Sequence, residues 1–254
     1  MNLLELLSYT TLVSIFGVAA YMDFKTRIIP DKVWIFTIIP TIMTILIIIN
    51  STKLLVQYIA SIIVGGVVAL LCYIFNITGG ADIKAIALLS IACLPKLEKL
   101  NSMFNIVMNI PTIAVICNTS IPILGYTLYV LLNNIKNFNK CREKSELRGI
   151  KKFLYMLSTM CVPVEEVFRN PHKYAISSVR VGDKLILKSI TKIVYDDPIE
   201  ELRRYIDQGL ISRNDNVLVL YYIPYVTCIF IGLVMYILLG NIFVHAYQLL
   251  KNLL

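Results

Sequence analysis

The chain is strongly apolar for its length and carries little charge. Of its 254 residues, 57% are hydrophobic and only 16% are charged, whereas about 25% charge is usual in a soluble protein. This composition excludes an ordinary soluble globular protein and favours a membrane protein. The formal net charge of +8 follows from how Lys and Arg are distributed around the expected membrane spans, so it does not indicate nucleic-acid binding.

Six apolar stretches are long enough, or nearly so, to cross a bilayer, which takes about 20 helical residues. The first lacks the basic residues that open a cleaved signal peptide, so we expect it to be retained. The third contains Gly65-Gly66, a predicted point of close helix packing. The region 103–132 is broken by prolines and is either one kinked helix or an interfacial piece followed by a span. The expected spans are 3–22, 33–49, 54–75, 82–94, 112–134 and 217–240.

The basic residues favour one orientation of these spans. Cytoplasmic connections carry an excess of Lys and Arg. With the N-terminus outside, the outer side receives only four of the 24 Lys and Arg residues, namely Lys53, Lys96, Lys99 and Lys251. We therefore expect a multi-pass protein of the cell membrane with its N-terminus outside.

The segment 135–216 is the one part with the composition of a soluble domain. Within it, 174–179 and 184–194 alternate and are rich in β-branched residues, which indicates a hairpin. The stretch 198–208 has helical spacing and is followed by Gly209 as a stop signal.

The predicted fold is a membrane all-α bundle of six transmembrane helices, with a small cytoplasmic α+β domain inserted before the last helix. The expected divisions are a membrane domain at 1–134, the soluble domain at 135–216, and the sixth helix with a C-terminal tail at 217–254.

Two aspartates lie at the cytoplasmic edge of the predicted bundle, where acidic residues usually mark a function or a buried pairing. Asp23 ends the first span and Asp82 starts the fourth on the same side. Two neighbouring carboxylates share one proton, because both cannot easily ionise. The ionised member can then take a proton from water while the protonated member polarises a peptide carbonyl. Alternatively, each aspartate caps a helix or pairs with Lys25, Arg27 or Lys84.

The cysteines and histidines predict no metal site. None of the six cysteines forms a C-x-x-C pair, and four lie in apolar stretches, so we expect neither zinc nor a disulfide framework. His172 and His245 lie far apart in sequence and have no ligand-like partners. No cofactor is therefore expected.

Two motifs resemble those of the type IV prepilin peptidases, which are G-x-G-D-type membrane aspartyl proteases. The run DFKTRIIPD, from Asp23 to Asp31, is similar to their D-x(6)-P segment. The run GGADIK, from Gly79 to Lys84, is similar to their G-x-G-D motif in its archaeal form. With six spans and a soluble insert before the last, the layout most resembles that of the archaeal preflagellin (prearchaellin) peptidases.

The resemblance implies an aspartic endopeptidase. Its substrates would be preflagellin or type IV pilin-like precursors, whose short basic leader is cleaved at the cytoplasmic face of the bilayer. Asp23 and Asp82 would form the catalytic pair that activates water.

The same motifs imply further site residues. Pro30 would shape the loop after the first helix, because its ring fixes φ. Gly79 and Gly80 would shape the approach to the second aspartate, since glycines permit unusual dihedral angles and close backbone approach. Lys84 stands at the basic position of the motif, where its charge would act on Asp82.

The sequence also departs from the bacterial relatives. Ala81 replaces the glycine before their second aspartate, and Asp31 stands where they usually have Asn. The four-cysteine zinc segment of the bifunctional bacterial enzymes is absent, so the resemblance does not extend to their N-methyltransferase activity.

Two other functions stay open at this point. A presenilin-like intramembrane protease shares the G-x-G-D motif. Such enzymes cut deep within the membrane, however, whereas Asp23 is close to a loop. An ion-coupled transporter could use both aspartates as proton or cation sites, but such carriers often contain internal repeats, and no convincing repeat is seen.

Overall fold

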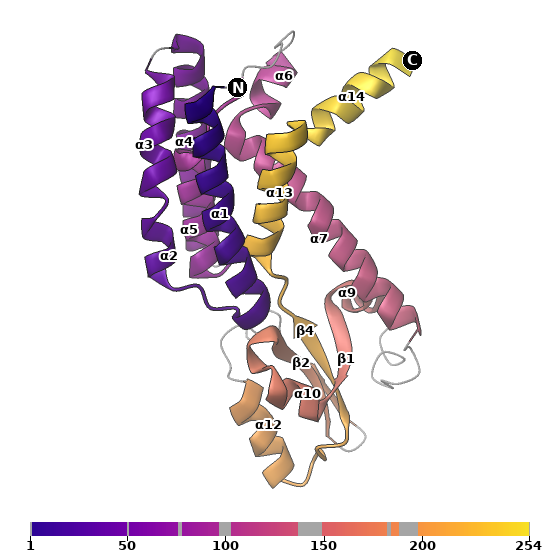
Figure 1. Ribbon diagram of the computed structural model, residues 1–254. Helices are drawn as coiled ribbons and strands as arrows, with labels where there is room; N and C mark the ends of the chain where they lie inside the picture. The colour runs from indigo at the N-terminus through magenta and orange to yellow at the C-terminus, as the bar shows by residue number, and fades with distance from the viewer. Residues whose placement is uncertain are drawn as a thin grey trace. The chain divides into compact units, whose positions relative to one another are not determined.

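The computed structural model describes residues 2–49, 51–75, 78–96, 103–136, 149–181, 184–187 and 198–253. The chain is mostly helical (Figure 1). It divides into two compact units, Met1–Ile123 together with Pro224–Leu254, and Leu124–Ile223. The first unit therefore combines both ends of the chain.

The first unit is a helical bundle, and the helix α7 continues from it into the second unit. Pro111 is the first residue of α7, a position where its missing N–H is tolerated. Pro122 lies inside the same helix. The helices are α1 (Leu3–Thr26), α2 (Asp31–Ile35), α3 (Ile38–Ile48), α4 (Thr52–Ile74), α5 (Gly80–Ala92), α6 (Met103–Met108), α7 (Pro111–Lys136), α13 (Tyr225–Leu239) and α14 (Ile242–Leu253).

Within the described residues, four helical segments are long and apolar enough to cross a membrane. They are Leu3–Thr26, Asp31–Ile48, Thr52–Ile74 and Pro111–Lys136. Helices α13 and α14, bent by 52°, add a fifth if the pair is one broken span. The sequence predicted six spans, and the sixth would be α5, which has only 13 residues.

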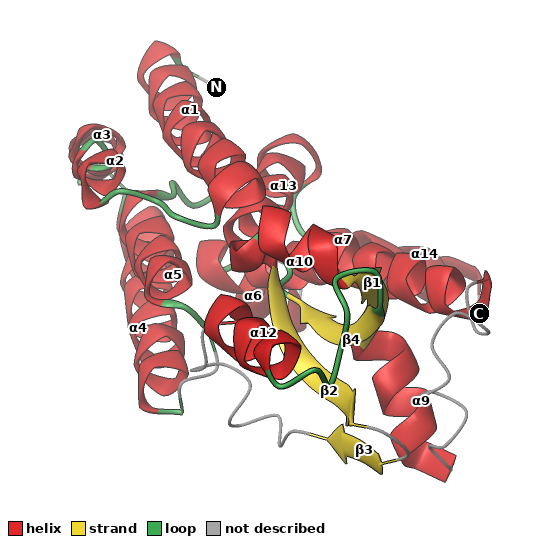
Figure 2. Cartoon of the chain, turned by 90° about the horizontal axis from the view of Figure 1, so that it is seen from below, coloured by secondary structure: helices red, strands yellow, loops and turns green. Residues whose placement is uncertain are grey.

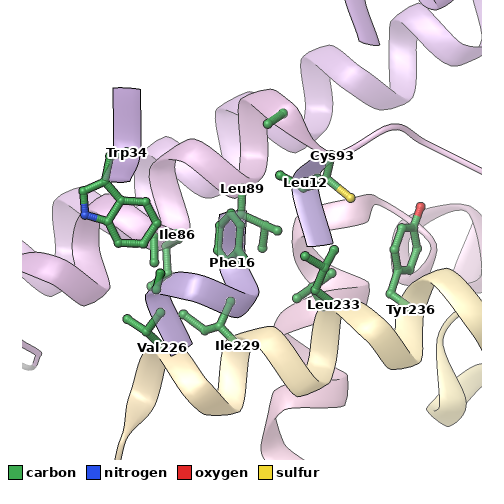
Figure 3. Packing of buried hydrophobic residues seen from close by; sticks show 14 of the residues in the cluster. Leu12, Phe16, Trp34, Ile86, Leu89, Cys93, Val226, Ile229, Leu233 and Tyr236 are labelled. Carbon is green, nitrogen blue, oxygen red and sulfur yellow. The ribbon is translucent and has the colours of Figure 1, made fainter. Parts of the chain in front are cut away.

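The core of the first unit forms where α1, α2, α5 and α13 meet (Figure 3). Phe16 of α1 packs edge-on against Trp34 of α2, with ring centroids 5.7 Å apart. Leu89 of α5 and Leu233 of α13 are fully buried beside them. These contacts pack α1, α2, α5 and α13 against one another.

One of the two adjacent glycines of α4 lies at a tight helix contact. A Cβ atom added to Gly65 would lie 2.2 Å from the Cβ of Ser90 in α5, whereas one added to Gly66 would meet nothing within 4 Å. The predicted close-packing point is therefore confirmed at Gly65 and does not extend to Gly66.

The second unit contains an antiparallel sheet in the order β1-β4-β2-β3 (Figure 2). Val167 and Leu202 from two of its helices are fully buried in one cluster with Val217 and Val219 of the sheet. Its elements are α9 (Gly149–Ser158), β1 (Thr159–Pro163), α10 (Val164–Arg169), a 3₁₀ turn (Pro171–Lys173), β2 (Tyr174–Val181), β3 (Lys184–Leu187), α12 (Pro198–Asp207) and β4 (Asn216–Tyr221).

Two predicted elements of this unit are confirmed and one boundary is wrong. Strands β2 and β3 form the hairpin, although the predicted continuation to 194 lies outside the described residues. Helix α12 forms as expected, and Gly209 follows it with a φ of 67°. The last span was expected to start at Val217, but Val217 belongs to β4 and α13 begins only at Tyr225. A short apolar run does not distinguish a buried strand from a helix.

The cysteines differ in their bonding. Cys72, Cys93, Cys117 and Cys228 are free thiols. Cys161 in β1 is disulfide-bonded, so the expectation of no disulfide is wrong at this residue. Spacing along the chain tests only nearby cysteines, whereas folding joins distant ones.

Candidate active site

The two motif aspartates lie at one end of the first unit. Asp23 lies in the last turn of α1 and Asp82 in the first turn of α5. Figure 1 shows these helix ends beside the start of α13. The charge of Asp23 lies close enough to act on Asp82, so folding brings two groups that are distant in sequence within electrostatic range of each other. We call Asp23 and Asp82 the aspartate pair.

Each oxygen of the Asp23 carboxylate lies near a donor group. The residue is only 7% exposed. Its Oδ2 accepts a hydrogen bond of 3.1 Å from the backbone N–H of Thr227, at the start of α13. Its Oδ1 lies 3.6 Å from Nη1 of Arg27, one turn further along the chain. Both oxygens of Asp23 therefore face donors.

The hydroxyl of Thr227 links α13 to α1 by a hydrogen bond. Its Oγ1 lies 2.9 Å from the carbonyl oxygen of Ala20 and 3.4 Å from Oδ2 of Asp23. A hydroxyl has one proton to donate, and the shorter distance favours the carbonyl. The backbone N–H of Thr227 is therefore the firmer donor to Asp23.

Asp82 is more loosely held. It is partly buried, and its Oδ2 accepts a hydrogen bond of 3.1 Å from the backbone N–H of Gly79. This is a cap of the α5 N-terminus, where a carboxylate is favourable. Among the described residues, no donor reaches its other oxygen.

The alternative roles predicted from sequence are thus partly present. Asp23 pairs with Arg27, and Asp82 caps α5. Neither role, however, requires the two carboxylates to share one end of the bundle. Their proximity is the feature that capping and local pairing leave unexplained.

Three other motif residues have ordinary backbone conformations. Pro30 precedes α2 with a φ of −63°, as its ring requires. Gly79 has φ −68° and ψ 159°, and Gly80 has no atom within 4 Å of an added Cβ. Neither glycine has a positive φ, and an added Cβ at Gly79 would lie 3.6 Å from Oδ2 of Asp82. Their role in shaping the approach to Asp82 stays a prediction.

Lys84 bonds away from the aspartate pair. Its Nζ lies 2.6 Å from Oδ1 of Asp31, and the two side chains are 50% and 79% exposed. This ion pair joins the starts of α5 and α2. Exposed pairs of this kind contribute about 0–1 kcal/mol to stability.

Sequence reasoning missed three neighbours of the pair or gave them no role. Arg27 was considered only as an alternative partner. Thr227 and Tyr225, whose phenol group lies within electrostatic range of Asp82, were not considered. An isolated Thr or Tyr in an apolar run gives no signal of its contact with a helix two hundred residues away. Among the described residues, no three His, Cys, Asp or Glu side chains gather as a metal site would require.

Two family models match the chain. The model of the type IV leader peptidase family matches residues 10–128, which include both aspartates. The model of the archaeal peptidase A24 C-terminus, type II, matches residues 151–242. No curated protein matches the chain. The two models follow one another along most of the sequence, and the chain belongs to the type IV leader peptidase family, with the C-terminal region of its archaeal members.

Proposed function

We propose that this protein is an aspartic endopeptidase that cleaves the short basic leader from preflagellin or type IV pilin-like precursors, with Asp23 and Asp82 as its catalytic pair. The observation that carries the proposal is that α1 and α5 place the two carboxylates at one end of the bundle, where the charge of Asp23 acts on Asp82. Membership of the leader peptidase family supports a substrate of this kind.

In this proposal the pair shares one proton and activates water. The ionised carboxylate takes a proton from a water molecule, whose oxygen attacks the scissile carbonyl carbon. The protonated carboxylate donates its proton to the carbonyl oxygen, which gives a tetrahedral intermediate. The C–N bond then breaks as the nitrogen takes the proton that the first carboxylate gained from water, and the proton on the former carbonyl oxygen returns to the second carboxylate. Water is the nucleophile, so no covalent intermediate forms.

The glycines at the start of α5 support access of an extended peptide. Gly79 and Gly80 are exposed, and no atom lies within 4 Å of an added Cβ at Gly80. A substrate backbone could therefore approach Asp82 without meeting a side chain there.

The proposed setting is the cytoplasmic face of the cell membrane. In this arrangement the N-terminus lies outside, α5 is a short fourth span, and the bilayer holds six spans in all. The excess of basic residues in the connections supports this orientation. We also propose that cleavage is not followed by N-methylation, because the sequence lacks the four-cysteine segment of the bifunctional relatives.

The experiment compares leader removal from a preflagellin-like substrate by purified wild type, Asp23→Asn and Asp82→Asn. Each amide variant should lose at least about a hundredfold in cleavage rate, because it removes one partner of the acid–base pair. Asp31→Asn is the matched control and should cleave at close to the wild-type rate. Normal cleavage by either Asp23→Asn or Asp82→Asn would refute the proposal, and aspartate-dependent ion flux without cleavage would indicate a transporter.

A further inference from the structure

Arg27 has a backbone conformation that L-amino acids rarely adopt. It ends α1 with φ 60° and ψ 13°, and among the described residues it is the one non-glycine with a positive φ. Helices often end in this left-handed conformation, but usually at Gly or Asn, which adopt it with less strain. A strained arginine at this position suggests that its side chain is needed.

The side chain of Arg27 is directed to the aspartate pair. It is only 8% exposed, and its Nη1 lies 3.6 Å from Oδ1 of Asp23. Its charge also acts on Asp82. A guanidinium leaves water only when a partner compensates its charge, and Asp23 supplies that partner. The other basic residues of the two motifs are exposed, with Lys25 near Tyr21 and Lys84 on Asp31.

The surroundings of the two aspartates are therefore unequal. Asp23 has a backbone N–H at one oxygen and a guanidinium at the other. Asp82 accepts a single backbone hydrogen bond. Donors and positive charge stabilise a carboxylate, so the negative charge of a pair that shares one proton is better held on Asp23.

We propose that Arg27 is a positioning residue that keeps the charge on Asp23, so that Asp23 is the base that activates water and Asp82 carries the shared proton. The assignment of roles rests on the proposed peptidase function. The electrostatic coupling of Arg27 to Asp23 does not, and it can be tested without a substrate.

Few other groups near the pair can titrate in the same range of pH. Cys228 and Tyr225 come from α13, and Cys72 of α4 interacts with Tyr225. Thiols and phenols stay neutral between about pH 4 and pH 7. Helix α3 has no titratable side chain, and the exposed carboxylate of Asp31 on α2 is bonded to Lys84 of α5; Asp31→Asn serves as the control for its contribution. A change in the pH profile over this range would therefore report on the aspartate pair.

The first test is the pH profile of kcat/KM for leader cleavage. Arg27→Asn suits the left-handed conformation but removes the charge, whereas Arg27→Lys keeps the charge. Without the charge, Asp23 takes up a proton at higher pH, so the acidic limb of the profile should move up by about 1 to 3 pH units. Arg27→Lys should keep most of the wild-type position, and Lys25→Asn, the matched control, should leave it unchanged. An unshifted limb in Arg27→Asn would overturn the proposal.

The second test is a double-mutant cycle on thermal unfolding in detergent. If Arg27 compensates Asp23, Arg27→Asn should lower the unfolding temperature clearly in wild type and little in the Asp23→Asn background. An equal decrease in both backgrounds would overturn the proposal, because it would show a purely structural role. If wild type cleaves no pilin-like substrate, the proposed function fails, and this cycle still decides whether Arg27 is coupled to Asp23.

Discussion

The orientation of Asp23 depends on a residue with no motif of its own. Thr227 donates its backbone N–H to the carboxylate and places its hydroxyl on the carbonyl of Ala20. Any residue other than proline could supply the N–H, whereas only a hydroxyl-bearing residue of this size could reach Ala20 as well. The hydroxyl of Thr227 therefore stabilises the contact between α13 and α1, whereas its backbone N–H orients the carboxylate of Asp23.

This division predicts a mild phenotype for Thr227→Val. The variant keeps the shape and the N–H but removes the hydroxyl, so kcat for leader cleavage should fall by less than about tenfold, since one neutral hydrogen bond contributes about 1 kcal/mol. Thr227→Ser, which keeps the hydroxyl, should behave as wild type. A loss in Thr227→Val as large as that in Asp23→Asn would place the hydroxyl in the chemistry itself.

At the scale of elements, local patterns predicted some structures and missed others. The hairpin of β2 and β3 and the amphipathic helix α12 follow from alternation and helical spacing, which each segment carries within itself. The boundary between β4 and α13 depends instead on pairing with β1 and β2, which an apolar run does not encode. Span counting predicted that Asp23 and Asp82 lie on the same side of the bundle, but their proximity depends on side-chain packing among α1, α5 and α13.

The contact between α4 and α5 predicts unequal effects at two adjacent glycines. Gly65→Ala places a methyl group against Ser90, so it should lower the free energy of unfolding by about 1–3 kcal/mol, as overpacking does. Gly66→Ala meets open space and should be neutral or stabilising by up to about 1 kcal/mol, because alanine favours a helix. Thermal or denaturant unfolding in detergent measures both. Equal effects would show that the helices do not approach at Gly65.

At the scale of the whole molecule, the order of the chain differs from the order of its units. The first unit is interrupted by Leu124–Ile223 and completed by Pro224–Leu254. Composition predicted a soluble insert at 135–216, because charge is concentrated there. It did not predict that the returning segment would bond to Asp23, since that contact joins residues 204 apart.

The proposed orientation predicts the accessibility of the connection between α1 and α2. Ile28 is 66% exposed in this connection, so a single cysteine introduced there in a cysteine-free background should react with an impermeant thiol reagent only from the cytoplasmic side. A cysteine at Ser51, between α3 and α4, serves as the opposite control and should react only from outside. External labelling at position 28 would contradict the cytoplasmic position of the aspartate pair.

The bond between α13 and Asp23 also has a consequence for biosynthesis. A ribosome completes α1 and α5, and with them both aspartates, well before it reaches Thr227. Until then the growing chain has the two carboxylates of the proposed catalytic pair without the N–H donor that orients one of them. If the proposed pair is catalytic, cleavage requires a chain synthesised at least as far as Thr227, and chains that terminate within the second unit would enter the membrane with an unfinished site.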